Sequence, residues 1–309
     1  MKRHIVYTLI TGIVIPSLLI ALTLRLRNRG EDVSEQSDIT NSSQQEVREN
    51  TVRVLTNSGI EDINLEDYIV CVLLGEMPLD FELEALKAQA VVARTYTCNR
   101  QQNPKHENAD VCTDSACCQA YVSQTDYAGS ERVRDAVRQT EGEVLVYAGE
   151  IIEATYFSCS GGRTEDAEAV WGSDIPYLQS VESPGEETSP RYTDTVRFSA
   201  KVFLEHLDIA DDSVQIENIR YTKGGGVLDL SINGKTFSGT QLRKLLQLRS
   251  TSFVITVIGE SVTITTKGFG HRVGMSQYGA EAMALQGKNY QDILSHYYVG
   301  TEITQLDLS

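Results

Sequence analysis

The pattern of apolar and polar residues divides the chain into an uncharged N-terminal run, a polar stretch and a long region of short, regularly spaced elements. Ile5 to Leu24 is a run of twenty residues without a charge, and a helix of that length can cross the hydrocarbon core of a bilayer, about 30 Å thick. No small-residue cleavage site follows it, so residues 1–27 are predicted to be a transmembrane helix retained as an anchor. Residues 28–50 are polar, and we interpret them as a flexible tether.

Regular periodicity begins near residue 51. Residues 51–55 alternate like a strand, and apolar residues then recur at helical spacing behind Asn64, which is a good helix cap. Pro78 ends this helix because proline disfavours the helical conformation of the residue before it. Glu76 is therefore expected at a helix C-terminus, where the negative end of the helix dipole disfavours a second negative charge. A carboxyl group in that position suits a general acid, although an exposed glutamate at a helix end is the simpler alternative.

A second helix is predicted from Leu83 to Asn99. Lys87 and Arg94 are spaced so that they fall on one stripe of this helix. The stripe could be a solvated basic face. It could also be directed at the same cleft as Glu76, where cations can grip carboxylate or acetamido oxygens.

Strand patterns dominate the middle of the chain. Residues 143–147 and 151–157 predict a hairpin, and the run Ser158 to Gly162 that follows offers hydroxyl groups and two glycines whose backbone amides can face a ligand. Residues 192–267 predict a smaller, mainly β lobe, because strand patterns there are separated by glycine-containing turns. Its strands are predicted at 192–198, 215–221, 227–232, 253–258 and 261–267, and its two helices at 200–206 and 240–246.

The C-terminal segment again carries polar residues that can bind a ligand. Gly268 to His271 does not fit regular structure, and the following residues lead into a helix that ends at Gly287. Asn289 predicts the cap of a final helix. The chain is thus predicted to be an α+β protein whose soluble region has two lobes around one cleft. Residues 51–191 form the lobe that contains Glu76, residues 192–267 the smaller lobe, and residues 268–309 a segment that returns to the cleft.

Charge limits the possible ligands. The chain has 309 residues and a net charge of −16, and its first 30 residues contain five basic residues and no acidic one. Residues 31–309 therefore carry 22 Lys and Arg against 43 Asp and Glu. This balance argues against nucleic acid as a partner, since binding it requires phosphate neutralisation. Any grip on an anionic polymer must be local, through Lys87, Arg94 or Arg272.

Six cysteines are present, and three of them lie close together with a histidine. His106, Cys112 and Cys118 are each six residues apart, with Cys117 alongside. Such a set of nitrogen and sulfur ligands suits tetrahedral zinc, with water, Cys117 or Asp110 as the fourth ligand. A disulfide between Cys112 and Cys118 beside a surface histidine explains the same spacing, so the residues alone leave both interpretations open.

Six blocks of sequence resemble a known family. They are LEDYIVCVLLGEMP, ALKAQAVVARTYT, HENADVCTDSACCQAY, ATYFSCSGGRTEDAEAVWG, SGTQLRKLLQLRSTSF and GFGHRVGMSQYGAEAMA. In this order they resemble the stage II sporulation protein D family of peptidoglycan lytic transglycosylases and the related amidase-enhancer proteins of the wall. The resemblance covers about residues 51 to 300. Cys159 stands where the family usually has Ser or Thr, and Arg272 where it more often has Gly.

The resemblance implies a catalytic role for Glu76 as the acid/base and a structural zinc beside the cleft, held by His106, Cys112 and Cys118. No cofactor is needed for the chemistry. The residues implied to line the cleft and bind substrate are Lys87, Arg94, Tyr156, Ser158, Ser160, His271, Ser276, Gln277 and Tyr278.

The resemblance also implies a reaction and a place for it. The expected activity is cleavage of the bond between N-acetylmuramic acid and N-acetylglucosamine in peptide-stripped glycan, giving 1,6-anhydro ends, during engulfment of the forespore. Expected partners are glycan strands, a wall amidase and other engulfment proteins of the membrane, with the soluble part outside the cytoplasm. Two alternatives belong to other classes: a non-catalytic wall-binding protein that activates an amidase, and a cysteine peptidase that uses Cys159 and His271.

Overall fold

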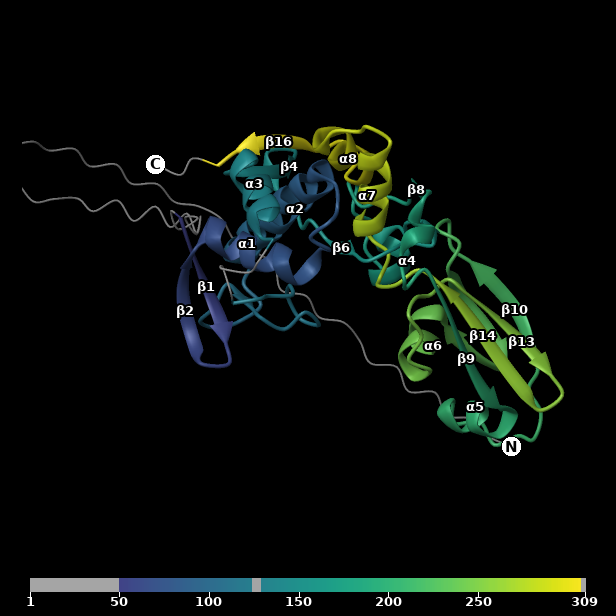
Figure 1. The fold of residues 1–309 in the computed structure, drawn as a ribbon. Coiled ribbons are helices and arrows are strands. Elements are labelled where there is room, and N and C mark those ends of the chain that lie inside the picture. The colour runs from purple at the N-terminus through teal and green to yellow at the C-terminus, as the bar shows by residue number, and fades with distance from the viewer. Residues whose placement is uncertain (1–49, 124–128, 307–309) are drawn as a thin grey trace, which may run out of the picture. The chain divides into compact units, whose positions relative to one another are not determined.

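The computed structural model of the chain describes residues 50–123 and 129–306 (Figure 1). Helices and strands are interspersed along this part of the chain, so the fold is mixed α and β. The helices are α1 (Leu65–Glu76), α2 (Leu83–Gln102), α3 (Glu131–Gln139), α4 (Ala167–Trp171), α5 (Ala200–His206), α6 (Gly239–Leu245), α7 (Gln277–Leu285) and α8 (Tyr290–Tyr297), with a 3-10 helix η1 (Glu186–Thr188). The strands are β1 (Thr51–Thr56), β2 (Gly59–Asn64), β3 (Val111–Cys112), β4 (Glu143–Tyr147), β5 (Glu150–Ile151), β6 (Tyr156–Phe157), β7 (Gly162–Arg163), β8 (Glu182–Ser183), β9 (Thr193–Ser199), β10 (Ile216–Tyr221), β11 (Val227–Ile232), β12 (Lys235–Ser238), β13 (Phe253–Ile258), β14 (Ser261–Lys267), β15 (Met275–Ser276) and β16 (Glu302–Gln305).

The predicted membrane anchor is not part of this structure. Residues 1–27 and the predicted tether of residues 28–50 lie outside the described residues, apart from Asn50. Among the helices of residues 50–123 and 129–306, none combines the length and the apolar character that a membrane span requires.

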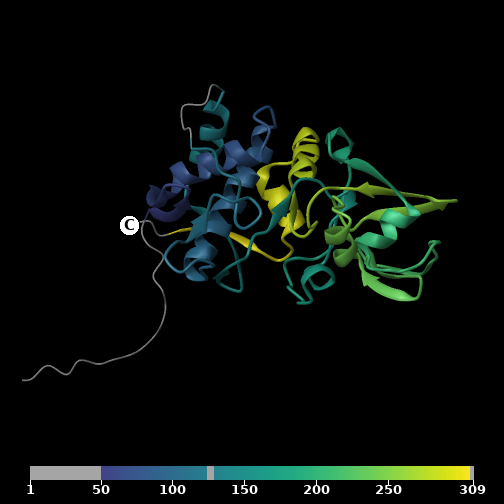
Figure 2. The same cartoon turned by 90° about the horizontal axis from the view of Figure 1, so that it is seen from below.

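Helix α2 is the centre of the larger hydrophobic core. Its sequence, LEALKAQAVVARTYTCNRQQ, is rich in small alanine side chains, and most of its residues are buried. Helices α1, α3, α7 and α8 and strand β4 all pack against it. Helices α7 and α8 come from the end of the chain, and both views show them next to elements of its first half (Figures 1 and 2). The C-terminal segment is therefore part of the same core as the helix that carries Glu76.

A second, separate hydrophobic core lies between Phe203 and Ile264 in the sequence. Strands β13, β14 and β9 form one antiparallel sheet, and β10, β11 and β12 form another. Helix α5 packs on β9 and β14 (Figure 1). Helix α6 packs on β11 and β12. Buried positions alternate along β14, as expected for a strand with one face on a core.

Short strand pairs join segments that are distant in the sequence. The predicted hairpin forms between β4 and β5, but its second strand is wrong as a single element over residues 151–157. The chain turns after Ile151 and changes partner, so that Tyr156 and Phe157 form β6 and pair in parallel with Met275 and Ser276 of β15. This two-residue pair positions the C-terminal segment beside the middle of the chain.

Candidate active site and metal centre

Glu76 is the last residue of α1, as the sequence predicts. The Asn64 side chain caps the first turn by accepting from two backbone N–H groups, and the chain leaves the helix at Met77, just before Pro78. Gly75 lies so close to the backbone of Ala120 and Tyr121 that an added Cβ would be 3.0 Å from the Tyr121 nitrogen. This close approach allows the 120–121 backbone to reach the Glu76 carboxyl group.

Three donors from distant segments surround the half-buried Glu76 carboxyl group. Its Oε1 accepts from the backbone N–H of Ala120 at 2.7 Å and from the Tyr156 hydroxyl at 3.0 Å. Its Oε2 accepts from Nε2 of Gln277 at 3.3 Å. Tyr156 belongs to β6, and Gln277 follows β15 directly, so the parallel pair of these strands delivers both side chains to the carboxyl group.

The Tyr156 hydroxyl lies between two acceptors. It is 3.0 Å from Glu76 Oε1 and 3.2 Å from the side-chain oxygen of Gln119. Gln119 is held in turn by contacts of its Nε2 with Thr97 at 3.0 Å and Tyr68 at 3.4 Å. Burial, followed by the nearby Glu76 carboxyl group, raises the pKa of Tyr156 well above its usual value, so the hydroxyl keeps its single proton.

One proton between two acceptors allows two arrangements. When Tyr156 donates to Glu76, it stabilises the ionised carboxylate. When it donates to Gln119, Glu76 Oε1 keeps its contact with the Ala120 N–H. The Tyr156 hydroxyl can therefore alternate between Glu76 and Gln119 as its acceptor. Gln119 was not among the residues implied by the sequence, and its place directly after two candidate metal ligands was the available signal.

A pocket of about 1040 Å³ surrounds this carboxyl group. Six of the ten residues implied to be catalytic or substrate-binding line it: Glu76, Tyr156, Ser158, His271, Gln277 and Tyr278. Aromatic side chains that can stack on sugar rings also line the pocket, including Trp171 and Phe269. The pocket also borders Cys117, Cys118 and Ala120, so the candidate metal centre and Glu76 share one wall.

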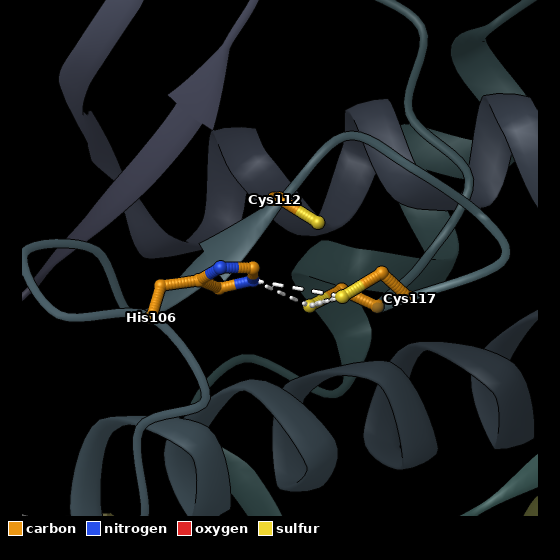
Figure 3. A group of neighbouring side chains, drawn as sticks. His106, Cys112 and Cys117 are labelled. Atoms are coloured by element: carbon orange, nitrogen blue, oxygen red, sulfur yellow. Dashed lines mark hydrogen bonds between the residues drawn. The ribbon is translucent and has the colours of Figure 1, made fainter.

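The candidate metal centre contains His106, Cys112, Cys117 and Cys118. Figure 3 labels the first three of these residues. Their four ligand atoms all lie within 4.8 Å of one another. Cys112 ends β3, which pairs in parallel with β1, and a turn closed by two backbone bonds to the Asp114 carbonyl presents Cys117 and Cys118. All six cysteines of the chain are unpaired in the structure, so Cys112 and Cys118 are not joined in a disulfide.

The ligand distances fit a tetrahedral metal with nitrogen and sulfur ligands. His106 Nε2 is 3.5 Å from the Cys118 sulfur and 3.7 Å from the Cys117 sulfur, and the two sulfurs are 3.9 Å apart. Bonds of about 2.3 Å to sulfur and about 2.0 Å to nitrogen predict a tetrahedral edge of about 3.5 Å between nitrogen and sulfur and of about 3.8 Å between two sulfurs. These four residues could therefore bind one metal ion.

The structure selects Cys117 from the three candidates for the fourth ligand. Asp110 is engaged elsewhere, since its carboxylate accepts from the backbone N–H of Arg53 at 2.9 Å and pairs with the Arg53 guanidinium at 2.8 Å. A set of one histidine and three cysteines without an open position is typical of structural metal sites.

Comparison with known proteins identifies the family. The family profile SpoIID, described as Stage II sporulation protein, matches residues 55–147, which include Glu76 and all four candidate metal ligands. The Stage II sporulation protein D of Bacillus amyloliquefaciens is 42% identical over 269 residues, covering 82% of this chain and 77% of the relative. The chain belongs to the stage II sporulation protein D family.

Two further relatives extend this comparison. The Stage II sporulation protein D of Bacillus subtilis is 42% identical over 268 residues, which are 81% of this chain and 77% of that protein. The Amidase enhancer of Bacillus subtilis is 33% identical over 289 residues, covering 75% of this chain but only 40% of the relative.

Four residues that the family resemblance implied for the cleft lie elsewhere in the structure. Arg94 is fully buried and forms a bidentate pair with Glu66, at 2.7 and 2.5 Å, instead of sharing an open stripe with Lys87. Lys87 pairs with Glu84 at 2.7 Å. The other two, Ser160 and Ser276, are buried, and neither lines the pocket described in residues 50–123 and 129–306.

The two buried serines organise the backbone around the site. The Ser160 hydroxyl donates to the buried Glu186 carboxylate, which also accepts from the backbone N–H groups of Ser160 and Gly161. The Ser276 hydroxyl accepts from the backbone N–H of Gly279 and caps α7. These contacts fix the glycine turn and the start of the helix that carries Gln277.

Arg272 has a structural role that the sequence did not reveal. Its φ angle of 68° lies in the region that favours glycine, and its side chain is 1% exposed. The guanidinium donates to the carbonyls of Ser160 and Gly224, both at 2.7 Å, and pairs with Glu165 at 3.1 Å. It therefore ties the glycine turn after β6 to the loop before β11, and the expected effect on substrate grip has no support in these contacts.

His271 lines the pocket as a neutral imidazole. It lies against the rings of Phe157 and Trp171, and its Nδ1 accepts from the backbone N–H of Val273 at 3.2 Å. Burial, with a further contribution from the charge of Arg243, lowers its pKa to about 4. His271 therefore serves at neutral pH as a hydrogen-bonding and packing residue.

The cysteine peptidase alternative is not supported by these groups. Burial raises the pKa of the Cys159 thiol, whereas a nucleophilic cysteine needs a lowered one. Cys159 is also absent from the lining of the described pocket.

Acidification is expected to destabilise the folded protein through the half-buried His271. The folded protein keeps this group neutral down to about pH 4, while the unfolded chain takes up a proton below its ordinary pKa of 6.5. Stability is therefore lost as the pH falls from 6.5 toward about 4. Between pH 6.5 and about 4, the thermal midpoint of His271→Gln should fall by less than that of the wild type. In His206→Gln, which changes an exposed histidine, the midpoint should fall with pH as it does in the wild type. Parallel curves for wild type and His271→Gln would contradict this assignment.

Proposed function

We propose that this chain is a membrane-anchored peptidoglycan lytic transglycosylase. The substrate is glycan already stripped of stem peptides, and the bond cleaved is the β-1,4 bond between N-acetylmuramic acid and N-acetylglucosamine. Glu76 acts as general acid and then as general base. Membership of the stage II sporulation protein D family and the aromatic lining of the pocket support this proposal.

The observation that carries the proposal is that the pocket offers one free carboxyl group. Glu76 and Glu153 are the acidic residues of its lining, as described for residues 50–123 and 129–306. Glu153 is paired with Arg100 at 2.5 Å, which leaves Glu76 as the acid without an ion pair in that lining. A hydrolytic glycosidase needs two carboxyl groups, whereas an internal nucleophile needs only one.

The proposed reaction uses the contacts of Glu76 directly. Oε1 is occupied by the Ala120 N–H and the Tyr156 hydroxyl, so Oε2, whose contact with Gln277 is the longer 3.3 Å, carries the transferable proton. Glu76 donates this proton to the glycosidic oxygen, which leaves as the C4 hydroxyl of N-acetylglucosamine. The C6 hydroxyl of the muramic residue bonds to the anomeric carbon, and its proton passes to Glu76. The product is a 1,6-anhydro end, and no water is consumed.

Product analysis tests the proposal. We expect the full-length chain in detergent to convert stripped glycan strands into products with 1,6-anhydromuramic ends, detected by mass spectrometry. Reducing ends that incorporate oxygen from labelled water would instead identify a hydrolase and require a second carboxyl group.

The metal centre is proposed to hold a structural zinc. His106, Cys112, Cys117 and Cys118 provide the ligands, and the ion would supply no chemistry to the bond being cleaved. The Cys117 to Ala120 segment runs directly from two ligands to the backbone N–H that contacts Glu76. The ligand loop therefore supports the position of the acid.

Location and partners complete the proposal. Residues 5–24 would hold the protein in the mother-cell membrane, with the folded part outside the cytoplasm, in the space between the mother-cell membrane and the membrane of the forespore. A wall amidase would act first, because the proposed substrate lacks stem peptides, and other engulfment proteins would act beside it.

A second candidate function is activation of an amidase by a non-catalytic wall-binding protein. The relative named Amidase enhancer favours it. The two functions predict different results with isolated glycan, since an activator alone would bind strands without producing new ends.

The Tyr156→Phe variant removes the hydroxyl and keeps the aromatic ring, so it tests the role of the hydroxyl alone. Tyr156→Phe leaves Glu76 Oε1 and Gln119 Oε1 each without one partner. We expect unfolding free energy to fall by about 1–3 kcal/mol and kcat for strand cleavage to fall by roughly tenfold. Urea denaturation and initial rates measure the two effects. Tyr221→Phe, at an exposed tyrosine, should change neither, and an unaltered kcat in Tyr156→Phe would remove the hydroxyl from the mechanism.

A further inference from the structure

Two cations line the pocket around Glu76 although the chain is strongly acidic. They are Lys105 and Arg191, and both are exposed. Lys105 Nζ donates to the Tyr96 hydroxyl at 3.2 Å and to the Cys117 carbonyl at 3.3 Å. The Arg191 guanidinium lies 4.8 Å from the centre of the Phe269 ring. Within residues 50–123 and 129–306, neither of them forms an ion pair with a carboxylate.

Other cations that could have bound an anionic ligand are already neutralised. Lys87, Arg94 and Arg272 pair with Glu84, Glu66 and Glu165. The pocket acid Glu153 is neutralised in the same way by Arg100. Lys105 and Arg191 therefore remain as cations without a carboxylate partner in the described lining of the pocket.

Two cations without carboxylate partners can bind one chemical feature of the proposed substrate. N-acetylmuramic acid carries a lactyl ether whose carboxyl group is an amide while a stem peptide is attached, and a free carboxylate once the peptide has been removed. Arginine can bind a carboxylate through two parallel hydrogen bonds, and lysine through a compact point charge. A neutral amide offers neither residue an opposite charge.

We propose that Lys105 and Arg191 form binding subsites for the free lactyl carboxylates of stripped glycan. This inference rests on the proposed function and adds the residues that would recognise peptide removal. The two residues lie in different segments of the lining, one beside Cys117 and the other beside Phe269. Selection of stripped strands is then a property of the pocket itself.

A binding cycle tests the proposal without catalysis. The full-length chain with Glu76→Gln is titrated with stripped glycan oligomers and with the same oligomers after conversion of their lactyl carboxylates to N-methyl amides. We expect the carboxylate strands to bind about tenfold more tightly. Added Lys105→Gln or Arg191→Gln should weaken carboxylate binding by roughly threefold to tenfold and leave amide binding unchanged. Lys201→Gln and Arg197→Gln, at exposed positions outside the pocket lining, are the matched charge controls and should leave both affinities unchanged.

The outcomes separate this inference from the proposed activity. Equal affinities for the two strands, or equal weakening of both by the cation variants, would overturn the inference while cleavage by the wild type could still be measured. Discrimination by the Glu76→Gln chain together with no cleavage by the wild type would support the subsites and overturn the lytic transglycosylase. Absence of binding to either strand would overturn the subsites as well.

Discussion

Glu76→Gln is expected to reduce the rate of glycan cleavage by at least about 10³-fold, with strand binding retained. General acid–base catalysis by a positioned side chain contributes roughly 10²–10⁴-fold, and in the proposed reaction the same carboxyl group serves in both directions. Glutamine keeps the size of the side chain, and its oxygen can still accept from the Ala120 N–H and the Tyr156 hydroxyl, but an amide acts neither as a general acid nor as a general base near neutral pH. Initial rates of anhydro-end formation measure the loss.

The matched control is the other acid of the pocket. Glu153→Gln removes a carboxylate from the same lining and breaks the pair with Arg100, yet it should retain most of the rate because Glu153 has no role in proton transfer. A similar loss in both variants would mean that two carboxyl groups take part. Full activity of Glu76→Gln would remove Glu76 from the chemistry and direct attention to the amidase-activator function.

Among the variants considered, loss of a single thiol from the proposed metal centre is expected to lower the stability of the fold most. Cys118→Ser should abolish binding of one metal equivalent per chain and lower the thermal midpoint by several degrees or more, because metal binding at structural sites contributes directly to folding, by about 10–16 kcal/mol in zinc-finger peptides. Metal content by mass spectrometry and thermal unfolding measure the two effects separately from activity. A chelator should lower the midpoint of the wild type in the same way.

Two control variants make this test specific. Cys159→Ser alters a buried thiol outside the metal centre and should keep the metal. Asp110→Asn tests the rejected fourth ligand and should also keep the metal, although it weakens the contact with Arg53. Retention of one metal equivalent by Cys117→Ser would instead show that three residues suffice.

Local physics predicted the elements whose signals lie within a few residues. Asn64 caps α1 and Asn289 caps α8 in a capping box, as their side chains indicated. The strands predicted at 227–232, 253–258 and 261–267 match β11, β13 and β14, because glycine-containing turns separate them in the sequence. The helix predicted over 200–206 matches α5.

The remaining features depend on partners that are distant in the sequence. Residues 151–157 look like one strand because each half is apolar, but β5 and β6 pair with different strands, and a two-residue strand has too few positions to show a period. Helix α3 and strand β12 were not anticipated at all.

Side-chain roles were harder to predict than elements. Arg94 has the spacing of an exposed cation, yet Glu66 is placed beside it by the packing of α1 on α2. Cys117 and Asp110 were equivalent candidates until β1 brought Arg53 next to Asp110. Lys105 and Arg191 lie in no periodic pattern, and only the folded pocket distinguishes them from other surface cations.

The parallel pair of β6 and β15 determines when, during synthesis, the contacts around Glu76 can form. Synthesis proceeds from the N-terminus, so Glu76, the metal loop and Tyr156 are present long before Met275 and Gln277. Until residues 275–277 have been synthesised, Tyr156 has no strand with which to pair, and Gln277 cannot contact Glu76. A chain that ends before β15 would therefore lack both the strand that aligns Tyr156 and the Gln277 contact with Glu76.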